Sequence, residues 1–112
     1  MTYNLTVTSR SFTLPPATPV QLLALNPNRR LLMLSVCDVN PAAFKFGSAP
    51  ASAVDGITLG GASASGGQGG SILFSDGDSH TTQTYTPVDA VYAMSALGTS
   101  VAIDEGTVYA FE

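Results

Sequence analysis

The feature that most constrains this chain is a largely apolar run of nine residues, 31–39, that contains neither glycine nor proline. A run of this length, rich in Leu and Val, is typical of a central β-strand that is buried on both faces. Asn26-Pro27-Asn28 comes shortly before it and favours a turn, because proline pushes the preceding residue out of the helical region and asparagine tolerates a left-handed backbone. The sequence therefore predicts a core organised around this strand, with a turn and two arginines at its entrance.

Shorter apolar or alternating stretches occur along the whole chain, separated by Pro, Gly and Asp-Gly turns. Alternation of apolar and polar residues is typical of strands that are buried on one face, and helical periodicity is not seen over more than about ten residues. These patterns predict an all-β fold, a single-domain antiparallel β-sandwich of about eight short strands, jelly-roll or Greek-key-like, with a small closed barrel as the alternative. The other candidate strands are residues 3–8, 12–14, 20–25, 43–47, 57–59, 71–75, 90–96, 100–104 and 107–112.

Several turn signals divide the candidate strands. Ser9-Arg10-Ser11 interrupts the first alternation, Leu97-Gly98-Thr99 predicts a tight hairpin between the strands on either side, and Glu105-Gly106 predicts a further turn. Asp76-Gly77-Asp78 has the start of a calcium-binding loop but lacks the acidic ligands that such a loop needs further on, so it is interpreted as a turn.

The N-terminal part of the chain is set apart by its prolines. Pro15, Pro16 and Pro19 exclude regular strand pairing and favour an extended connector. We therefore expect an N-terminal strand and Pro-rich arm over residues 1–19 and a β-sandwich domain over residues 20–112, together forming one compact unit. The arm is expected to lie either on its own domain or on a neighbouring subunit.

No arrangement of residues in the sequence predicts catalysis, cofactor binding or a metal site, so an enzyme is not expected. His80 and Cys37 are single residues of their kinds, and a lone residue without a cluster of partners is more typical of structure than of ligation or nucleophilic attack. Cys37 is interpreted as a small buried thiol. The Gly-rich segment 60–71 lacks the Lys-Ser/Thr ending of a phosphate loop and is interpreted as a surface loop, either flexible or ordered by a neighbouring subunit.

The chain carries little charge: charged residues make up 11% of it, and the formal net charge is −4. An acidic balance argues against binding to nucleic acid or to an anionic membrane. Ser, Thr and Gly must cover much of the surface, and such short neutral side chains lose little entropy when a partner immobilises them, as in a packed assembly. No signal peptide and no apolar stretch of the ~18 residues of a membrane helix is seen, so we expect synthesis in the cytoplasm.

Contacts with other subunits are expected at the N-terminal strand and arm, at the two arginines and in the Gly-rich segment. Arginine is favoured at interfaces, and the alternative for Arg29 and Arg30 is to face solvent or to pair with an aspartate. The candidate contact residues are Tyr3, Leu5, Val7, Phe12, Arg29, Arg30, Gly66, Gly67 and Gln68.

The order of these patterns resembles small virion proteins of tailed bacteriophages, in particular capsid decoration (cement) proteins and related head- or fibre-associated β-sandwich modules. The resemblance extends over residues 20–112. It is carried by Asn26-Pro27-Asn28-Arg29-Arg30, Phe44-Lys45-Phe46-Gly47, the Gly-rich segment, Ala90-Val91-Tyr92-Ala93-Met94-Ser95, a Gly-Thr turn and Val101-Ala102-Ile103-Asp104-Glu105-Gly106.

The resemblance implies a non-enzymatic structural protein on the outer surface of a phage head, which it stabilises through symmetric, multivalent contacts. The implied partners are the major capsid protein and further copies of the chain itself, as a homodimer or homotrimer. The alternative is a tail-fibre or receptor-binding module that recognises a host surface glycan, with Tyr85, Tyr92 and Tyr109 as candidate stacking surfaces.

Overall fold

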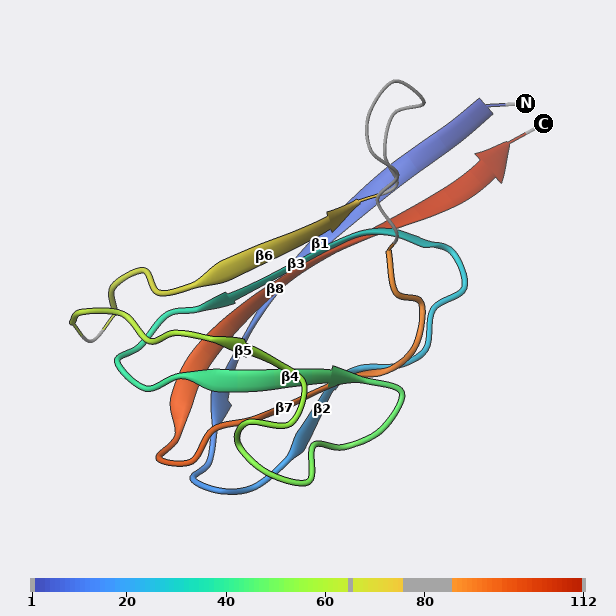
Figure 1. The fold of residues 1–112 in the computed structure, drawn as a ribbon. Coiled ribbons are helices and arrows are strands. Elements are labelled where there is room, and N and C mark those ends of the chain that lie inside the picture. Colours follow the sequence, from blue (N-terminus) through green and yellow to red (C-terminus); the bar gives the residue numbers. More distant parts are fainter. Residues whose placement is uncertain (1, 65, 76–85, 112) are drawn as a thin grey trace.

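The computed structural model describes residues 2–64, 66–75 and 86–111, and every regular element within these ranges is a β-strand. The strands form two antiparallel sheets, ordered β1-β8-β3-β6 and β2-β7-β4-β5 (Figure 1). This confirms the predicted all-β sandwich. The strands are β1 (Thr2–Leu14), β2 (Val20–Leu23), β3 (Arg29–Val36), β4 (Ala42–Phe46), β5 (Ile57–Leu59), β6 (Ser71–Ser75), β7 (Val91–Met94) and β8 (Thr99–Phe111).

Consecutive strands change sheet at nearly every step, and β4–β5 is the one directly connected pair that shares a sheet. Two four-stranded sheets joined by such crossings form a jelly roll. The hairpin predicted at Leu97-Gly98-Thr99 is therefore wrong, because β7 and β8 belong to different sheets. Gly98, with a φ of 85°, turns the chain across the sandwich instead of back along it.

The two longest strands, β1 and β8, pair with each other over their full length without a register shift. Neither the break predicted at Ser9-Arg10-Ser11 nor the turn predicted at Glu105-Gly106 exists. Residues of low strand propensity are held in both strands by the ladder that their partner supplies. The strand part of the predicted arm is therefore the edge strand of the first sheet, whereas residues 15–19 form an irregular connector, as their prolines predict.

The core lies between the two sheets, and β3 contributes alternate residues to it. Leu32, Leu34 and Val36 are completely buried, whereas Leu31 and Met33 are half-buried on the outer face. The prediction that this strand is buried on both faces is wrong, since the second sheet covers only one face. The buried cluster comprises Leu14, Leu22, Leu23, Leu32, Leu34, Val36, Ala42, Phe44, Leu59, Val91, Ala93, Val101 and Ile103.

The part of the chain that the structure describes contains no helix with the length and apolarity to cross a membrane.

Candidate functional site

The free edge of β1 presents a long row of backbone groups with which no described strand pairs. On β8, the Val108 N–H donates to Asn28 O (3.0 Å) and Ser100 O accepts from Cys37 N–H (2.8 Å), so even-numbered residues of β8 bond toward β3. Alternate residues of a paired strand bond to opposite sides, so odd-numbered residues of β8 bond to β1, where their partners are even-numbered. The residues of β1 with N–H and C=O directed to the free edge are therefore Tyr3, Leu5, Val7, Ser9, Ser11 and Thr13.

The other three sheet edges are shorter. β2 has four residues, follows Pro19 closely and contains a register shift between Gln21 and Leu23. β5 has three residues and β6 has five. Short strands, prolines and bulges are the usual means by which proteins close an edge to further pairing, and β1, with 13 residues and no proline, has none of them.

The outer face of the first sheet carries exposed apolar side chains. Val7 on β1 is 52% exposed and Leu73 on β6 is 56% exposed. Between their strands lie the half-buried Leu31 and Met33 of β3, with Met33 directly opposite Leu73. Asp104, opposite Met33 on β8, is the charged residue among them. We call Val7, Leu31, Met33 and Leu73 the outer apolar face.

Two candidate contacts on β1 therefore lie on different sides of the sheet. Val7 lies on the outer face, opposite Gly106 in the regular register, and is 52% exposed. Phe12 is partly buried and packs against the core. Tyr3 and Leu5 belong to β1 and pair in register with Ala110 and Val108.

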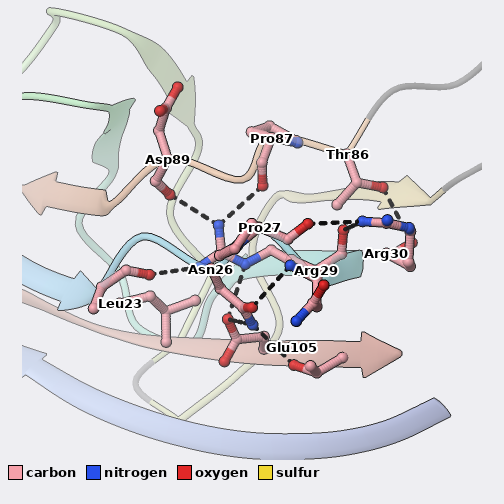
Figure 2. Close-up of polar contacts among 12 residues, drawn as sticks. Leu23, Asn26, Pro27, Arg29, Arg30, Thr86, Pro87, Asp89 and Glu105 are labelled. Atoms are coloured by element: carbon pink, nitrogen blue, oxygen red, sulfur yellow. Dashed lines mark hydrogen bonds and ion pairs between the residues drawn. The ribbon is translucent and has the colours of Figure 1, made fainter. Parts of the chain in front are cut away.

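Arg29 has no exposed area, and its side chain is the largest fully buried one among the described residues. Its Nε donates to Glu105 Oε2 at 2.9 Å. Its Nη1 donates to the carbonyl oxygens of Pro87 and Asp89 (2.9 and 2.8 Å), and its Nη2 donates to Ala24 O (3.0 Å) (Figure 2). All three nitrogens of its guanidinium donate within the chain, so this structure does not present the Arg29 side chain to a partner.

Asn26 completes the cluster from the β2–β3 connection. Its Nδ2 donates to Glu105 Oε2 (3.2 Å) and to Thr107 Oγ1 (2.9 Å), while its backbone N–H donates to Val88 O (2.8 Å). Asn26 and Arg29 together hold the β2–β3 connection, the segment before β7 and the middle of β8 side by side (Figure 2). The predicted turn at Asn26-Pro27-Asn28 is confirmed and positions both side chains, with Arg29 N–H donating to Asn26 O.

A register shift between Arg29 and Leu31 explains why the sequence pattern missed this burial. Strict alternation would place Arg29 on the same outer side as Leu31 and Met33. In the structure, Arg29 pairs with Thr107 and Leu31 with Gly106, so one extra residue, Arg30, lies between two successive partners. This bulge reverses the side on which the preceding residue lies and directs Arg29 inward.

Arg30 is half-buried and is bound to its own strand entrance. Its Nη1 donates to the carbonyl oxygens of Pro27 (3.1 Å) and Arg29 (2.9 Å), and its own carbonyl accepts from Thr86 Oγ1 (3.1 Å). It therefore stabilises the turn rather than extending from it.

The Gly-rich segment is tied to the sandwich by backbone hydrogen bonds. Ala62 N–H donates to Asp38 O (2.6 Å), and Gly69 N–H donates to Val36 O (2.8 Å). A side chain at Gly61 would have its Cβ 1.9 Å from Val39 O, so the close approach requires glycine. The candidates Gly66 and Gln68 are exposed at the turn of this segment, and Gly67 is half-buried.

The remaining candidates for chemistry offer little. Cys37 is half-buried, not buried as expected, and follows the end of β3. Residues 2–64, 66–75 and 86–111 contain no group of His, Cys, Asp or Glu suited to a metal ion. His80 and Asp76-Gly77-Asp78 lie outside the described residues. Tyr92 is half-buried on β7 between Gln21 and Lys45 of the neighbouring strands, so its role in a glycan site stays a prediction.

The geometry thus defines a jelly-roll sandwich with an open strand edge, an outer apolar face and a buried arginine cluster. No protein-family model matches the chain, and the comparison with curated proteins found no match. A solved structure described as "Bacillus endospore appendages form a novel family of disulfide-linked pili" is similar, with a TM-score of 0.55 and 19% sequence identity. The alignment covers 99% of this chain and 90% of the appendage chain. At this identity, the similarity establishes the shared all-β fold.

Proposed function

We propose that this chain is a non-enzymatic structural subunit of a repeating surface assembly. In this proposal the subunits bind the outer surface of a tailed-phage head. The observation that carries the proposal is the outer apolar face. Val7 and Leu73 are both more than half exposed on one sheet face that is otherwise neutral except for Asp104. Apolar side chains gathered on one face mark an interaction surface more often than single exposed residues do.

The fold and the resemblance of residues 20–112 to capsid decoration proteins support the same function. A β-sandwich can present the outer face of one sheet at many equivalent positions of a shell. Repetition by symmetry then makes modest single contacts strong in sum. In this role the chain reinforces the head by bridging neighbouring capsid subunits.

The test is sedimentation of purified protein with expanded phage heads. We expect the chain to pellet with heads at a fixed copy number, and we expect Val7→Lys/Leu73→Lys to lose that binding because it places charge on the apolar face. Val54→Lys is the matched control, since Val54 is 76% exposed on a loop away from this face and its replacement should leave binding unchanged. Wild-type protein that stays in the supernatant with intact heads contradicts the proposal.

A second candidate is a subunit of an extracellular appendage, which the structural similarity to a Bacillus pilus protein favours. The cysteine count limits this function. Residues 1–112 contain one cysteine, which can join two subunits by a disulfide but cannot link a third. In an appendage built from this chain, the contacts beyond such a disulfide-linked pair would therefore be noncovalent. Filaments seen by electron microscopy of purified protein, without binding to heads, would favour this candidate.

A further inference from the structure

We infer that two copies of this chain pair antiparallel through their β1 edges, so that their first sheets join into one continuous sheet. The inference goes beyond the proposed function, because it names the partner and the surface of a dimer that can form without any head or appendage. It rests on the backbone of β1 and on the contrast between this edge and the other three.

The free edge of β1 has backbone N–H and C=O groups to which a further strand could bond. Its alternate residues from Tyr3 to Thr13 direct N–H and C=O away from β8, and no described segment pairs with them. Such a row is a template for another strand. The edges at β2, β5 and β6 extend over five residues or fewer, so none offers a ladder of comparable length to a second copy.

The positions of the free-edge residues are compatible with self-pairing. Full overlap of two antiparallel β1 strands puts residues 3 and 13, 5 and 11, and 7 and 9 opposite one another, each pair occurring twice. Every member of these pairs directs its hydrogen-bonding groups to the free edge, as a closely bonded antiparallel pair requires. Thr8 then lies opposite Thr8 of the partner, on the twofold axis.

The charge of β1 also fits a second copy. Arg10 is the single charged residue in the strand. In the full-overlap register Arg10 lies opposite Thr6 of the partner, so like charges do not face each other. An antiparallel contact of one edge with itself is isologous and closes after two copies, which favours a dimer over the homotrimer that was also expected.

The first experiment measures mass by light scattering and sedimentation. Because an interface of one strand is small, the chain concentration is raised to about 1 mM. We expect the mass to approach twice the 11.5 kDa of one chain. Ser9→Pro removes an N–H from the free edge without removing a bond to β8 and should weaken the dimer by at least about tenfold.

The matched control is Leu73→Pro on β6, at the opposite edge of the same sheet. Leu32 and Leu34 of β3 form their hydrogen bonds with even-numbered residues of β6. Odd-numbered residues of β6 therefore bond away from β3, so Leu73 directs its N–H to the free edge as Ser9 does. We expect this variant to remain a dimer. A wild-type chain that is monomeric at every concentration overturns the inference, and so does equal weakening by both prolines, which indicates pairing of β1 with β6.

A second experiment reads the register directly and does not depend on how the proline variants fold. In a Cys37→Ser background, Thr8→Cys should form an intermolecular disulfide on mild oxidation, because directly opposed strand residues lie within disulfide range. Thr6→Cys should not, since residue 6 faces residue 10 of the partner. Cross-linking that is equal at both positions contradicts the register. If the chain forms the cross-linked dimer but does not bind heads, the proposed function is contradicted and the inferred dimer is not.

Discussion

Arg29 brings four acceptor groups from three segments of the chain to one guanidinium. Its partners come from the end of the β2 region, from the segment before β7 and from Glu105 on β8. A buried ion pair adds little stability relative to well-packed apolar residues, but removing one partner leaves polar groups buried without hydrogen bonds. Arg29 therefore acts mainly by fixing how these segments meet.

Replacement of this residue tests that role. Arg29→Ala should lower the free energy of unfolding by about 3–5 kcal/mol, because Glu105 loses its buried charge partner and three carbonyl oxygens lose a donor. Arg30→Ala is the matched control, since it removes the same charge one residue away and should cost about 1 kcal/mol. Urea unfolding followed by circular dichroism gives both values. A loss for Arg29→Ala no larger than that for Arg30→Ala contradicts the assigned role.

Asp55 provides a second prediction at the residue scale, concerning pH. Its Oδ2 accepts from Ala51 N–H (2.8 Å) and from Lys45 Nζ (2.9 Å), and these contacts hold the pKa of Asp55 below its ordinary value. A lowered pKa in the folded state means that its stabilising contribution is present above the ordinary aspartate pKa of about 3.9 and is lost as pH falls through the folded value.

We therefore expect the stability difference between wild type and Asp55→Asn to be constant near neutral pH and to shrink below about pH 4. Urea unfolding of both proteins across this range measures it. Because the Asp55 side chain is partly exposed to solvent, the difference should be small at every pH. A difference that grows as the solution becomes more acidic is the opposite of this expectation.

At the scale of elements, the first and last strands of the described chain, β1 and β8, lie next to each other in the first sheet. β1 pairs with β8 from Thr2 to Leu14, and Leu14 and Val101 on these strands are both buried in the core. Ladders between such distant segments form late, because their loop-closure entropy must be overcome first. β1 is thus needed for the sandwich itself, and truncation of residues 1–18 would disturb the fold as well as any contact.

The Gly-rich segment offers a prediction with a built-in control. Gly61→Ala should destabilise the protein by about 1–3 kcal/mol, because its Cβ would overlap Val39 O and force the backbone apart. Gly60→Ala has nothing within 4 Å of its Cβ and should be neutral or slightly stabilising. Thermal unfolding of the two variants measures the contrast. Similar melting temperatures would mean that the segment is not held against Val39.

At the scale of the whole molecule, the two proposed contact surfaces are nearly free of charge. The outer apolar face has Asp104 as its charged neighbour, and β1 has Arg10. Screening by salt acts on charges, whereas burial of apolar area and backbone hydrogen bonds is affected far less. Assembly through these surfaces should therefore tolerate salt.

We predict that the dimer dissociation constant changes less than about threefold between roughly 0.05 and 0.5 M sodium chloride. Salt screens interactions between charges, and no charged residues face each other across the inferred interface. Sedimentation equilibrium at both salt concentrations measures it. An Asp104→Lys variant serves as the control for charge on the neighbouring strand and should keep the same dependence. A dissociation constant that rises tenfold or more with salt would indicate an electrostatic interface.

The sequence predicts the class of fold well because alternation and turn residues act locally. The strands from Ala42 to Phe46 and from Ser71 to Ser75 appear close to where their patterns indicate. The pairing of strands depends on contacts between distant residues, so the crossing at Gly98 and the uninterrupted length of β8 could not be read from the pattern. The burial of Arg29 depends on a single bulged residue that alternation cannot reveal.

The pairing of β1 with β8 also determines how the molecule responds to force. Thr2 lies opposite Phe111, so the two ends of the described chain leave at one tip (Figure 1). A pull between these ends acts along the interstrand hydrogen bonds, which lie perpendicular to antiparallel strands. It opens the ladder one residue pair after another, as a zipper opens. A force parallel to the strands instead acts on all hydrogen bonds of the ladder at once, so the sandwich resists it far better.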